Sequence, residues 1–537
     1  MSRTPPQAHR QTLPEAAAND ERTVLERADW PWLATLLLVG CLVLVGVNVH
    51  AQRVTAGRGG VPLDDAWIHF QFARNLARGE GFAFNPGEPT AGSTAPLWTL
   101  LLAAVYAAGG GFPAGAKALS GASYLLSLLA AFALGKCLTG RRWAAWLAAA
   151  VAAVNGRLVW AGLSALETPL FAALTLMAAA SHLRKRAATR YHLRTAALFG
   201  LASLTRPEGT LFFALSLADY ALGARVDEGG EPATPRPLLK HAWSAPASLV
   251  PAVGLYGLML LPYVLFSLRT AGHVFPNTFS AKATVTLRPD LAFLSLAARY
   301  LILDSPLLLP FFVLGLGVLF GRARAIAAWV VGLPLAYALL HASLYQHGRY
   351  LIPLIPFNAV VAVVGLLAGA RLAARRGWRW SGGRRWVGIP LVVLALAGTA
   401  WRLPTMARHY AQDVKTANQM HVAIVRWEGS SAPEDALLAL NDIGAIGYVS
   451  ERRVVDLAGL VTPEVVPMLR SPERASRLLA YMAARGVDYV IIFPDWFPGL
   501  AERADLLQPV HYVTLEERTI TGGETMVVYR ADWTALE

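Results

Sequence analysis

The sequence predicts a polytopic α-helical membrane protein that ends in a small α/β domain. Apolar, nearly charge-free runs recur up to residue 402, and after that point short strand-like and helix-like segments alternate. The mean hydropathy of +0.42, with 55% hydrophobic residues, is too high for an ordinary soluble protein. We expect a disordered cytoplasmic tail over 1–28, a transmembrane domain over 29–402 whose first outer loop covers 50–95, and a soluble extracytoplasmic domain over 403–537.

The apolar runs set the number of membrane crossings. They lie at about 31–49, 96–110, 118–135, 143–155, 166–181, 195–222, 247–268, 299–320, 325–344, 351–370 and 387–401. A spanning helix needs about 20 apolar residues, so these runs predict about eleven or twelve crossings, with the shortest runs the weakest.

Basic residues set the orientation. The segments 181–194 and 371–386 are rich in Arg and Lys and contain no acid, so both should be cytoplasmic. This makes the protein a multi-pass protein of the cytoplasmic membrane, with its N-terminus inside and its C-terminal domain outside. The basic segment 138–143 also prefers the inside, which requires the run at 96–110 to dip into the membrane and return.

The net charge of +13 has an ordinary explanation in these inner loops. From residue 403 onward there are 12 Lys and Arg against 18 Asp and Glu, so the excess lies in the membrane part, next to lipid headgroups. We therefore expect membrane lipids as partners and no nucleic acid. Cys41 and Cys137 both fall in apolar runs, so no disulfide is expected in the exported domain.

Two adjacent acids, Asp64 and Asp65, follow the first apolar run, of which 31–49 is 19 residues without a charge. Charges placed this close to a membrane are costly to hold and are usually functional. The alternative is that the pair caps the helix that follows, because acids favour helix N-termini. Residues 66–78 are compatible with an amphipathic helix that lies on the membrane surface.

Further polar residues collect at the predicted outer ends of spans. Glu167 begins one span, where a capping acid is the alternative, and Arg206 and Glu208 interrupt the run at 195–222, where a tight turn with an ion pair is the alternative. The others, which either follow or precede a span, are Asn277, Lys282, His347, Arg349 and Tyr350. Basic residues at span ends can simply reach for headgroups, but Arg and Lys also suit a phosphate.

The segment after residue 402 alternates strand-like phrases such as GVDYVIIF with helix-like ones such as SRLLAYMAARG, which indicates a small α/β domain. The phrase DIGAIGY lacks the GxGxxG spacing of a dinucleotide site. A tight strand-to-helix turn is therefore favoured over nucleotide binding.

The phrases DDAWIHFQFARNLARGEGFAFNPGEP, GLSALETPLF, LTRPEG, PNTFSAK and HGRYLIPLIP together carry a resemblance. They resemble the bacterial GT-C glycosyltransferases, and most closely the polyprenyl-phosphate-sugar-dependent arabinofuranosyltransferases and the protein mannosyltransferase-like enzymes. The resemblance covers about 30–402 and the tail phrases DIGAIGY and VVDLAGL.

This resemblance implies an inverting transfer of a sugar from a polyprenyl-phosphate donor to a hydroxyl of a cell-envelope glycan, lipid or protein. Asp64 would be the general base, and Asp65 would orient the acceptor or bind a divalent cation such as magnesium or manganese; no other cofactor is expected. The donor phosphate would be held by Arg349, Lys282 and Arg206. The remaining substrate contacts would come from Glu167, Asn277, His347, Glu208 and Tyr350.

Two other classes of protein stay open from the residues alone. A flippase or transporter of lipid-linked sugars should bury charges at mid-membrane and show related halves, whereas here the polar residues gather at one face and no internal repeat is visible. The other class is a non-catalytic envelope assembly subunit whose exported domain is the working part.

Overall fold

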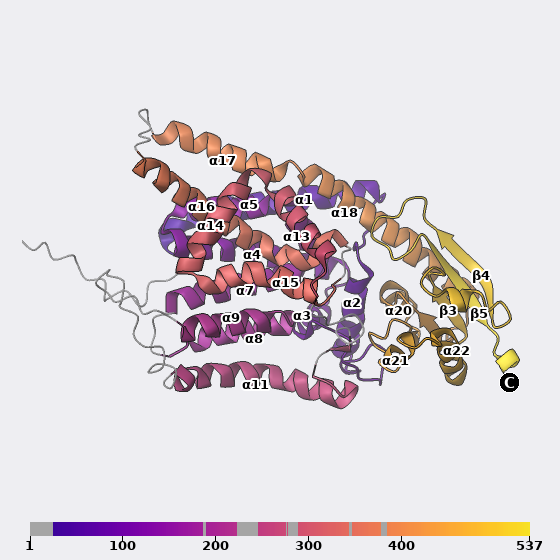
Figure 1. The fold of residues 1–537 in the computed structure, drawn as a ribbon. Coiled ribbons are helices and arrows are strands. Elements are labelled where there is room, and N and C mark those ends of the chain that lie inside the picture. The colour runs from indigo at the N-terminus through magenta and orange to yellow at the C-terminus, as the bar shows by residue number, and fades with distance from the viewer. Residues whose placement is uncertain are drawn as a thin grey trace, which may run out of the picture.

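The computed structural model describes residues 25–185, 190–222, 245–274, 276–277, 288–342, 346–376 and 384–536. A bundle of apolar helices fills one part of the molecule, and a small domain with a β-sheet lies at one end of the bundle (Figure 1). The chain is thus a polytopic helical membrane protein with a C-terminal α/β domain, as predicted. The predicted disordered tail lies, up to residue 24, outside the described residues.

Most of the bundle helices run along one common axis (Figure 1). The bundle helices are α1 (Trp30–Val54), α4 (Ala114–Thr139), α5 (Arg142–Ala153), α6 (Gly156–Leu163), α7 (Thr168–Lys185), α8 (Leu193–Thr205), α9 (Gly209–Ala221), α11 (Ala245–Ala271), α13 (Leu291–Asp304), α14 (Leu309–Arg322), α15 (Arg324–Leu339), α16 (Ile355–Arg375) and α17 (Arg384–Ala400). The chain bends by 65° between α5 and α6 and by 97° between α13 and α14. A one-turn η2 (Pro306–Leu308) joins α13 to α14, and η3 (Gln346–Leu354) leads into α16.

Length and composition allow several of these helices to cross a membrane. Among the described residues, 4 helices are long and apolar enough, or 6 if each bent pair, α5 with α6 and α13 with α14, is one span. Shorter apolar helices, among them α8, α9 and α15, accompany them. The total of about eleven or twelve crossings therefore stays a prediction.

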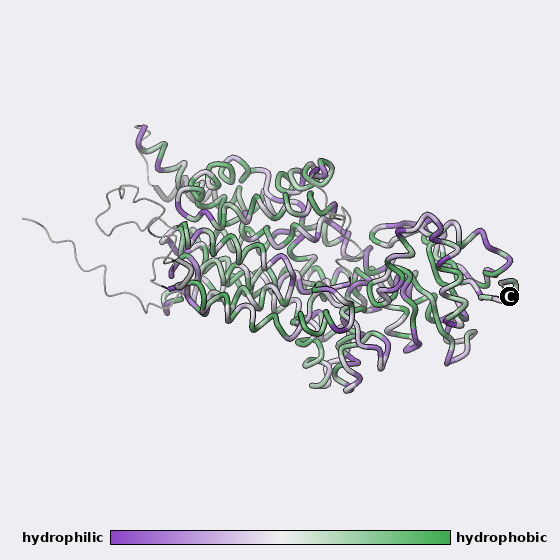
Figure 2. The backbone as a smooth tube through the Cα atoms, turned by 60° about the horizontal axis from the view of Figure 1, so that its bottom comes forward, coloured by the Kyte–Doolittle hydropathy of each residue, from purple (hydrophilic) through white to green (hydrophobic). Residues whose placement is uncertain are grey.

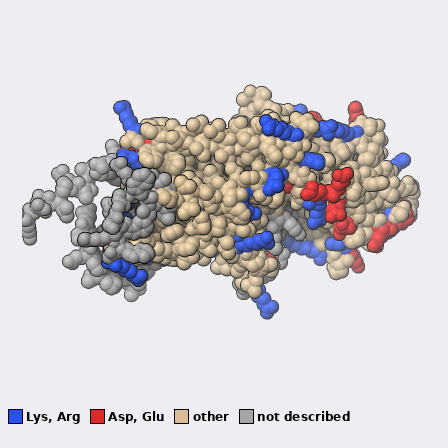
Figure 3. All heavy atoms as spheres, turned by 90° about the horizontal axis from the view of Figure 1, so that it is seen from above, with Lys and Arg blue, Asp and Glu red and all other residues tan. Residues whose placement is uncertain are grey.

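The outer surface of the bundle is apolar. Large hydrophobic side chains such as Leu42 on α1 and Leu258 on α11 are 63% and 64% exposed. Figure 2 shows hydrophobic residues along the whole bundle, and Figure 3 shows a broad band of its surface without charged residues. A water-soluble protein rarely exposes so large an apolar area, so this band is the surface that faces lipid.

The end of the bundle away from the α/β domain is tied together by ion pairs. Buried Asp29, before α1, lies 2.6 Å from Lys136 at the end of α4 and 2.7 Å from Arg142 at the start of α5. Near the ends of α7 and α9, His182 lies 2.9 Å from Asp219. The two basic segments of the sequence leave from this same end. This placement agrees with a cytoplasmic end, while the side of the membrane stays a prediction.

Helix α3 (Pro96–Ala107) has only 12 residues, and it packs against the first helix of the outer loop rather than along the bundle. At 1.5 Å per residue it is about 18 Å long, well short of the roughly 30 Å of a bilayer core. Helix α4 starts from the same end and finishes beside Asp29. This geometry agrees with a run at 96–110 that returns without crossing, as expected from the basic segment 138–143, and the path through the membrane stays a prediction.

The C-terminal domain has one five-stranded sheet in the order β2-β1-β3-β5-β4. The strands are β1 (Leu438–Leu440), β2 (Val454–Asp456), β3 (Tyr489–Ile492), β4 (Leu507–Thr514) and β5 (Thr525–Ala531). Strands β2, β1 and β3 are parallel, Ala439 facing Val455 and Val490. Strand β5 pairs antiparallel with β3, and β4 pairs antiparallel with β5 and forms the edge. The helices are α18 (Leu403–Ala417), η4 (Asn418–Val422), α19 (Ala423–Ser431), α20 (Gly444–Ser450), α21 (Val465–Leu469), α22 (Arg474–Arg485) and α23 (Pro498–Ala501).

Helix α2 (Asp64–Ala77) does not lie on the membrane surface, which corrects the sequence prediction. Nine of its residues are buried. Phe70 packs into the core of the bundle, whereas Ile68 and Phe72 complete a core of the C-terminal domain together with Met420 and Leu440. The helix has apolar residues on two faces because it is clamped between two parts of the protein.

The polar side of α2 is satisfied by protein rather than by headgroups. Gln71 and Asn75 donate hydrogen bonds to the carbonyl of Phe84 at 2.9 and 2.8 Å, and Arg74 lies 2.9 Å from Glu451 at the end of α20. These bonds fix the first outer loop between the bundle and the C-terminal domain. The acid pair at the start of α2 is therefore held at the junction of the two parts.

Candidate functional site

The two acids of the pair occupy the first turn of α2, which begins at Asp64 directly after the extended Leu63. Successive residues of a helix point about 100° apart. Asp64 accordingly faces the C-terminal domain, and Asp65 faces the bundle. The pair therefore divides into two different environments.

Asp64 is bound by the start of α20, within the phrase DIGAIGY. Its Oδ2 accepts a hydrogen bond from the backbone N–H of Gly444, and its Oδ1 accepts one from Ala445, both at 2.7 Å. A Cβ at position 444 would lie 2.2 Å from the Asp64 carbonyl oxygen, so only glycine allows this approach. The phrase forms a strand-to-helix turn, as predicted, and its N–H groups are occupied by a carboxylate of the chain itself.

A histidine and a second acid complete this contact. His421 Nε2 lies 4.0 Å from Asp64 Oδ1 and 3.3 Å from Asp442 Oδ2. Burial raises the pKa of Asp64 to about 6, against the opposing charge of His421 and the two N–H donors. Burial alone would lower the pKa of His421, but Asp442 and Asp64 outweigh it and raise the pKa to about 9. At neutral pH this is an ion pair in the domain junction.

Asp65 faces a different partner. Its Oδ2 lies 2.6 Å from Nη1 of Arg349, which stands in η3 just before α16. The guanidinium of Arg349 also lies 5.3 Å from the centre of the Tyr350 ring. The side chains of Asp65 and Arg349 are 25% and 12% exposed, so the pair is partly open.

A second arginine stands beside this pair. Arg206, at the break between α8 and α9, lies 3.1 Å from Glu167 and 3.0 Å from Glu208, and it donates a 2.9 Å hydrogen bond to the hydroxyl of Tyr337. Its guanidinium lies 5.4 Å from the centre of the Tyr350 ring, which links it to Arg349. Four distant segments thus converge at the end of the bundle that carries the C-terminal domain.

Buried His69 of α2 lies next to the same group. Its Nδ1 is 3.3 Å from the hydroxyl of Ser93 and 3.4 Å from that of Thr99. Burial lowers its pKa, and the charges of Glu167 and Asp65 act in the opposite direction. His69, Tyr337, His421 and Asp442 were not predicted as site residues. His69 and Asp442 lie inside the phrases DDAWIHF and DIGAIGY, so these phrases could have drawn attention to them, whereas Tyr337 and His421 lie outside every quoted phrase and gave no signal.

Three predicted residues lie apart from this cluster or outside the description. Asn277 is buried, and its side chain donates a 3.1 Å hydrogen bond to Thr90 of the first outer loop. His347 lies 2.8 Å from Asp413 of α18. Lys282 lies outside the described residues.

The cluster fits a divalent cation poorly. The Asp65 oxygen that could bind a metal lies 2.6 Å from the positively charged Arg349. No group of three or more His, Cys, Asp or Glu side chains in the described part of the chain is arranged to hold a metal ion. We therefore derive no step through a metal.

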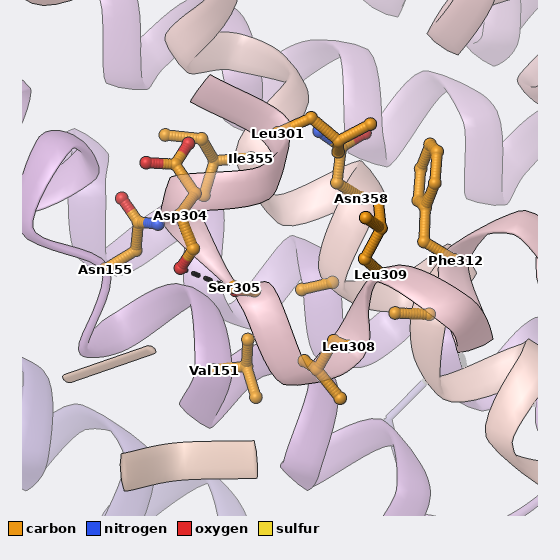
Figure 4. A pocket seen from close by; sticks show the side chains of 12 residues that line it. Val151, Asn155, Leu301, Asp304, Ser305, Leu308, Leu309, Phe312, Ile355 and Asn358 are labelled. Atoms are coloured by element: carbon orange, nitrogen blue, oxygen red, sulfur yellow. Dashed lines mark hydrogen bonds between the residues drawn. The ribbon is translucent and has the colours of Figure 1, made fainter. Parts of the chain in front are cut away.

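A small cavity inside the bundle is lined by Asn155, Asp304, Ser305 and Asn358 among apolar residues (Figure 4). The hydroxyl of Ser305 donates a 2.7 Å hydrogen bond to the Asp304 carbonyl, and Asp304 Oδ2 lies 2.7 Å from Arg157. The volume of the cavity is about 30 Å³, which is enough for one or two water molecules. This cavity is too small for a substrate.

Solved structures share the whole architecture. ArnT from Cupriavidus metallidurans matches with a TM-score of 0.58 at 14% identity, over 94% of this chain and 98% of its own. The archaeal oligosaccharyltransferase AglB from Archaeoglobus fulgidus, in complex with an inhibitory peptide and a dolichol-phosphate, matches with a TM-score of 0.55 at 14% identity, over 95% of this chain and 75% of its own. The chain has the GT-C fold. The fold implied by the resemblance is thus confirmed.

The GT-C fold accounts for both parts of the chain, because each of these matches covers more than nine-tenths of it. ArnT has also been solved bound to undecaprenyl phosphate, and that structure matches with a TM-score of 0.57 at 14% identity, over 92% of this chain and 98% of its own. A family model described as a domain of unknown function, DUF8728, matches residues 408–534. No curated protein matches the sequence.

Proposed function

We propose that this protein is an inverting membrane glycosyltransferase. It transfers a sugar from a polyprenyl-phosphate donor to a hydroxyl of an envelope glycan, lipid or protein at the outer face of the cytoplasmic membrane. The observation that carries this proposal is the partly open Asp65–Arg349 pair at one end of a GT-C bundle. The undecaprenyl phosphate and dolichol-phosphate of the similar structures support a lipid-phosphate donor.

The geometry favours Asp65 over Asp64 as the general base. Both oxygens of Asp64 already accept hydrogen bonds from the backbone of α20, so Asp64 acts as a positioning residue that fixes the start of α2. Asp65 is the more exposed of the two, with 25% of its side chain exposed against 15% for Asp64. This assignment revises the order expected from the sequence, in which Asp64 was the base.

The reaction requires a carboxylate beside the acceptor hydroxyl and a positive charge beside the donor phosphate. Asp65 takes the proton of the acceptor hydroxyl while the acceptor oxygen bonds to the anomeric carbon, and the bond from that carbon to the phosphate oxygen breaks with its electrons on the phosphate. Arg349 neutralises the negative charge that the phosphate gains. Its Nε is buried and has no hydrogen-bond partner among the described residues, so it retains a donor for an anion.

Arg206 serves this arrangement indirectly. Its guanidinium is already shared among Glu167, Glu208 and Tyr337, and it contacts the face of Tyr350. We assign it, with Glu167 and Glu208, to positioning Tyr350 and η3 beside the donor. Lys282 keeps its proposed role in phosphate binding, and Asn277 supports residues 90 and 91 of the outer loop.

The test begins with the donor, taken as the polyprenyl-phosphate sugar that accumulates when the gene is deleted. Purified protein should transfer this sugar, and Asp65→Asn should reduce the rate by about 100- to 10,000-fold with unchanged thermal stability. Asp64→Asn should instead lower thermal stability, because it weakens the contact with α20. A lipid-linked sugar transporter would move the donor without forming a glycoside. Transfer by Asp65→Asn within a few-fold of wild type would remove Asp65 from the role of base.

A further inference from the structure

A separate cavity lies where the bundle meets the C-terminal domain. It has a volume of about 570 Å³, which is within the range of small-molecule sites. It is lined by His50, Val54, His347, Arg408, His409, Gln412, Asp413, Glu517 and Thr519. These residues come from the end of α1, from η3, from α18 and from the loop between β4 and β5.

The lining is unusual in its chemistry. Every side chain except that of Val54 can form hydrogen bonds, whereas most ligand pockets are predominantly apolar. With the histidines neutral, one positive charge from Arg408 faces two negative charges from Asp413 and Glu517. Such a lining disfavours a phosphate or another anion. It suits an uncharged ligand that carries many hydroxyl groups.

Asp413 gives this cavity a built polar wall. The residue is fully buried, and its Oδ2 accepts a hydrogen bond from Trp160 at 3.0 Å and lies 2.8 Å from His347 Nε2. Its Oδ1 is buried without a hydrogen-bond partner in the described part of the chain. An unpaired buried carboxylate oxygen is costly, and a ligand hydroxyl is the kind of group that would satisfy it.

The cavity also lies beside the reacting groups. His347 and Arg349 are two residues apart, so their Cα atoms are separated by at most about 7 Å. Arg157 holds this turn in place through hydrogen bonds of 2.8 Å to the carbonyls of His347 and Gly348. A ligand seated against His347 is therefore close to the Asp65–Arg349 pair.

We propose that this cavity is the acceptor site and that the acceptor portion bound there is an uncharged carbohydrate. The role of the cavity as an acceptor site rests on the proposed function, whereas the class of its ligand rests on the side chains that line the cavity. Donor and acceptor would then approach Asp65 from opposite sides of η3, the donor phosphate at Arg349 and the acceptor glycan at His347.

The experiment uses the full-length protein in lipid nanodiscs and two photoreactive probes, an octyl mannopyranosyl disaccharide and an octyl arabinofuranosyl disaccharide, each with a diazirine. Val54→Trp fills the cavity, and Val49→Trp is its matched control on the same helix; these valines are 41% and 38% exposed, and only Val54 lines the cavity. We expect at least one probe to label peptides of α18 or of the loop between β4 and β5. Val54→Trp should reduce the labelling at least about tenfold, and Val49→Trp should leave it unchanged.

Two further measurements keep the outcomes distinct. Gln412→Ala, which removes only an exposed 3.0 Å hydrogen bond to Glu517, should weaken labelling several-fold without unfolding the protein. Asp65→Asn should reduce transfer as above but keep the labelling. A wild-type protein that is labelled but transfers no sugar would keep the carbohydrate site and refute the proposed function. The proposal is overturned by equal labelling of the Val54→Trp and Val49→Trp proteins, by competition from inorganic phosphate, or by absence of labelling in the wild type.

Discussion

Substituting Gly444 by alanine should separate the C-terminal domain from the acid pair. The new Cβ would lie 2.2 Å from the Asp64 carbonyl oxygen and 2.7 Å from its Oδ2, so the two segments must move apart by about 1 Å. That shift stretches both 2.7 Å hydrogen bonds to Asp64 beyond normal length. Each hydrogen bond to a charged group contributes about 1.5 to 3 kcal/mol to stability. Alanine is more stable than glycine within a helix by up to about 1 kcal/mol, which offsets part of the loss. We expect a net loss of roughly 2 to 5 kcal/mol in domain docking.

The assay is limited proteolysis of the full-length protein in nanodiscs, together with thermal unfolding and the transfer rate. Gly429→Ala is the matched control, because Gly429 is an exposed helical glycine of the same domain and a Cβ there meets no atom within 4 Å. The Gly444→Ala protein should release its C-terminal domain faster and transfer sugar more slowly than the control. Equal proteolysis and equal transfer in the two proteins would refute the idea that α20 holds Asp64.

Three further predictions follow from the same contacts. Arg349→Gln should raise the KM for the donor and lower kcat, so that kcat/KM falls at least about tenfold, and Arg349→Lys should restore it only in part. Unchanged kinetics would leave Lys282 rather than Arg349 as the residue that binds the donor phosphate. The pKa of His421 is raised from 6.5 to about 9, so the protonated histidine stabilises docking of the C-terminal domain. This contribution is fully present below pH 6.5, amounts to roughly 3 kcal/mol at most, and is lost as the pH rises through 9. Thermal unfolding should show this loss in the wild type and not in His421→Gln; a parallel loss in both would contradict it. In a background without native cysteines, Thr521→Cys should react with an impermeant thiol reagent on intact cells and Arg379→Cys should not, and the reverse result would place the site in the cytoplasm.

The sequence predicted the elements of this fold better than the contacts between them. Apolar runs and an alternating tail are local patterns, so the bundle and the α/β domain could both be anticipated. The break at Arg206 was also visible, because a proline and a glycine interrupt an apolar run. Its partner Tyr337, in contrast, lies 131 residues away and looks like any aromatic residue of a spanning helix.

The environment of α2 shows why the rest could not be predicted. The polar residues Gln71, Arg74 and Asn75 of α2 are typical of a helix whose polar face contacts lipid headgroups. The sequence does not show whether water, headgroups or protein form the hydrogen bonds of these side chains. The carboxylate of Asp64 meets Ala445, 381 residues further along the chain. Only the folded domain brings these two together, and only then do the roles of the adjacent acids separate.

The shared core around α2 also has a consequence for the order of biosynthesis. Ile68, Phe72 and Phe84 lie early in the sequence, yet they share one core with Leu438 and Val528, which lie more than 350 positions later. Until β5 has been synthesised, the core that holds these side chains is incomplete. A nascent chain therefore carries an unassembled site throughout its insertion. Strand β5 therefore completes the core that orders the first outer loop only after most of the chain has been made.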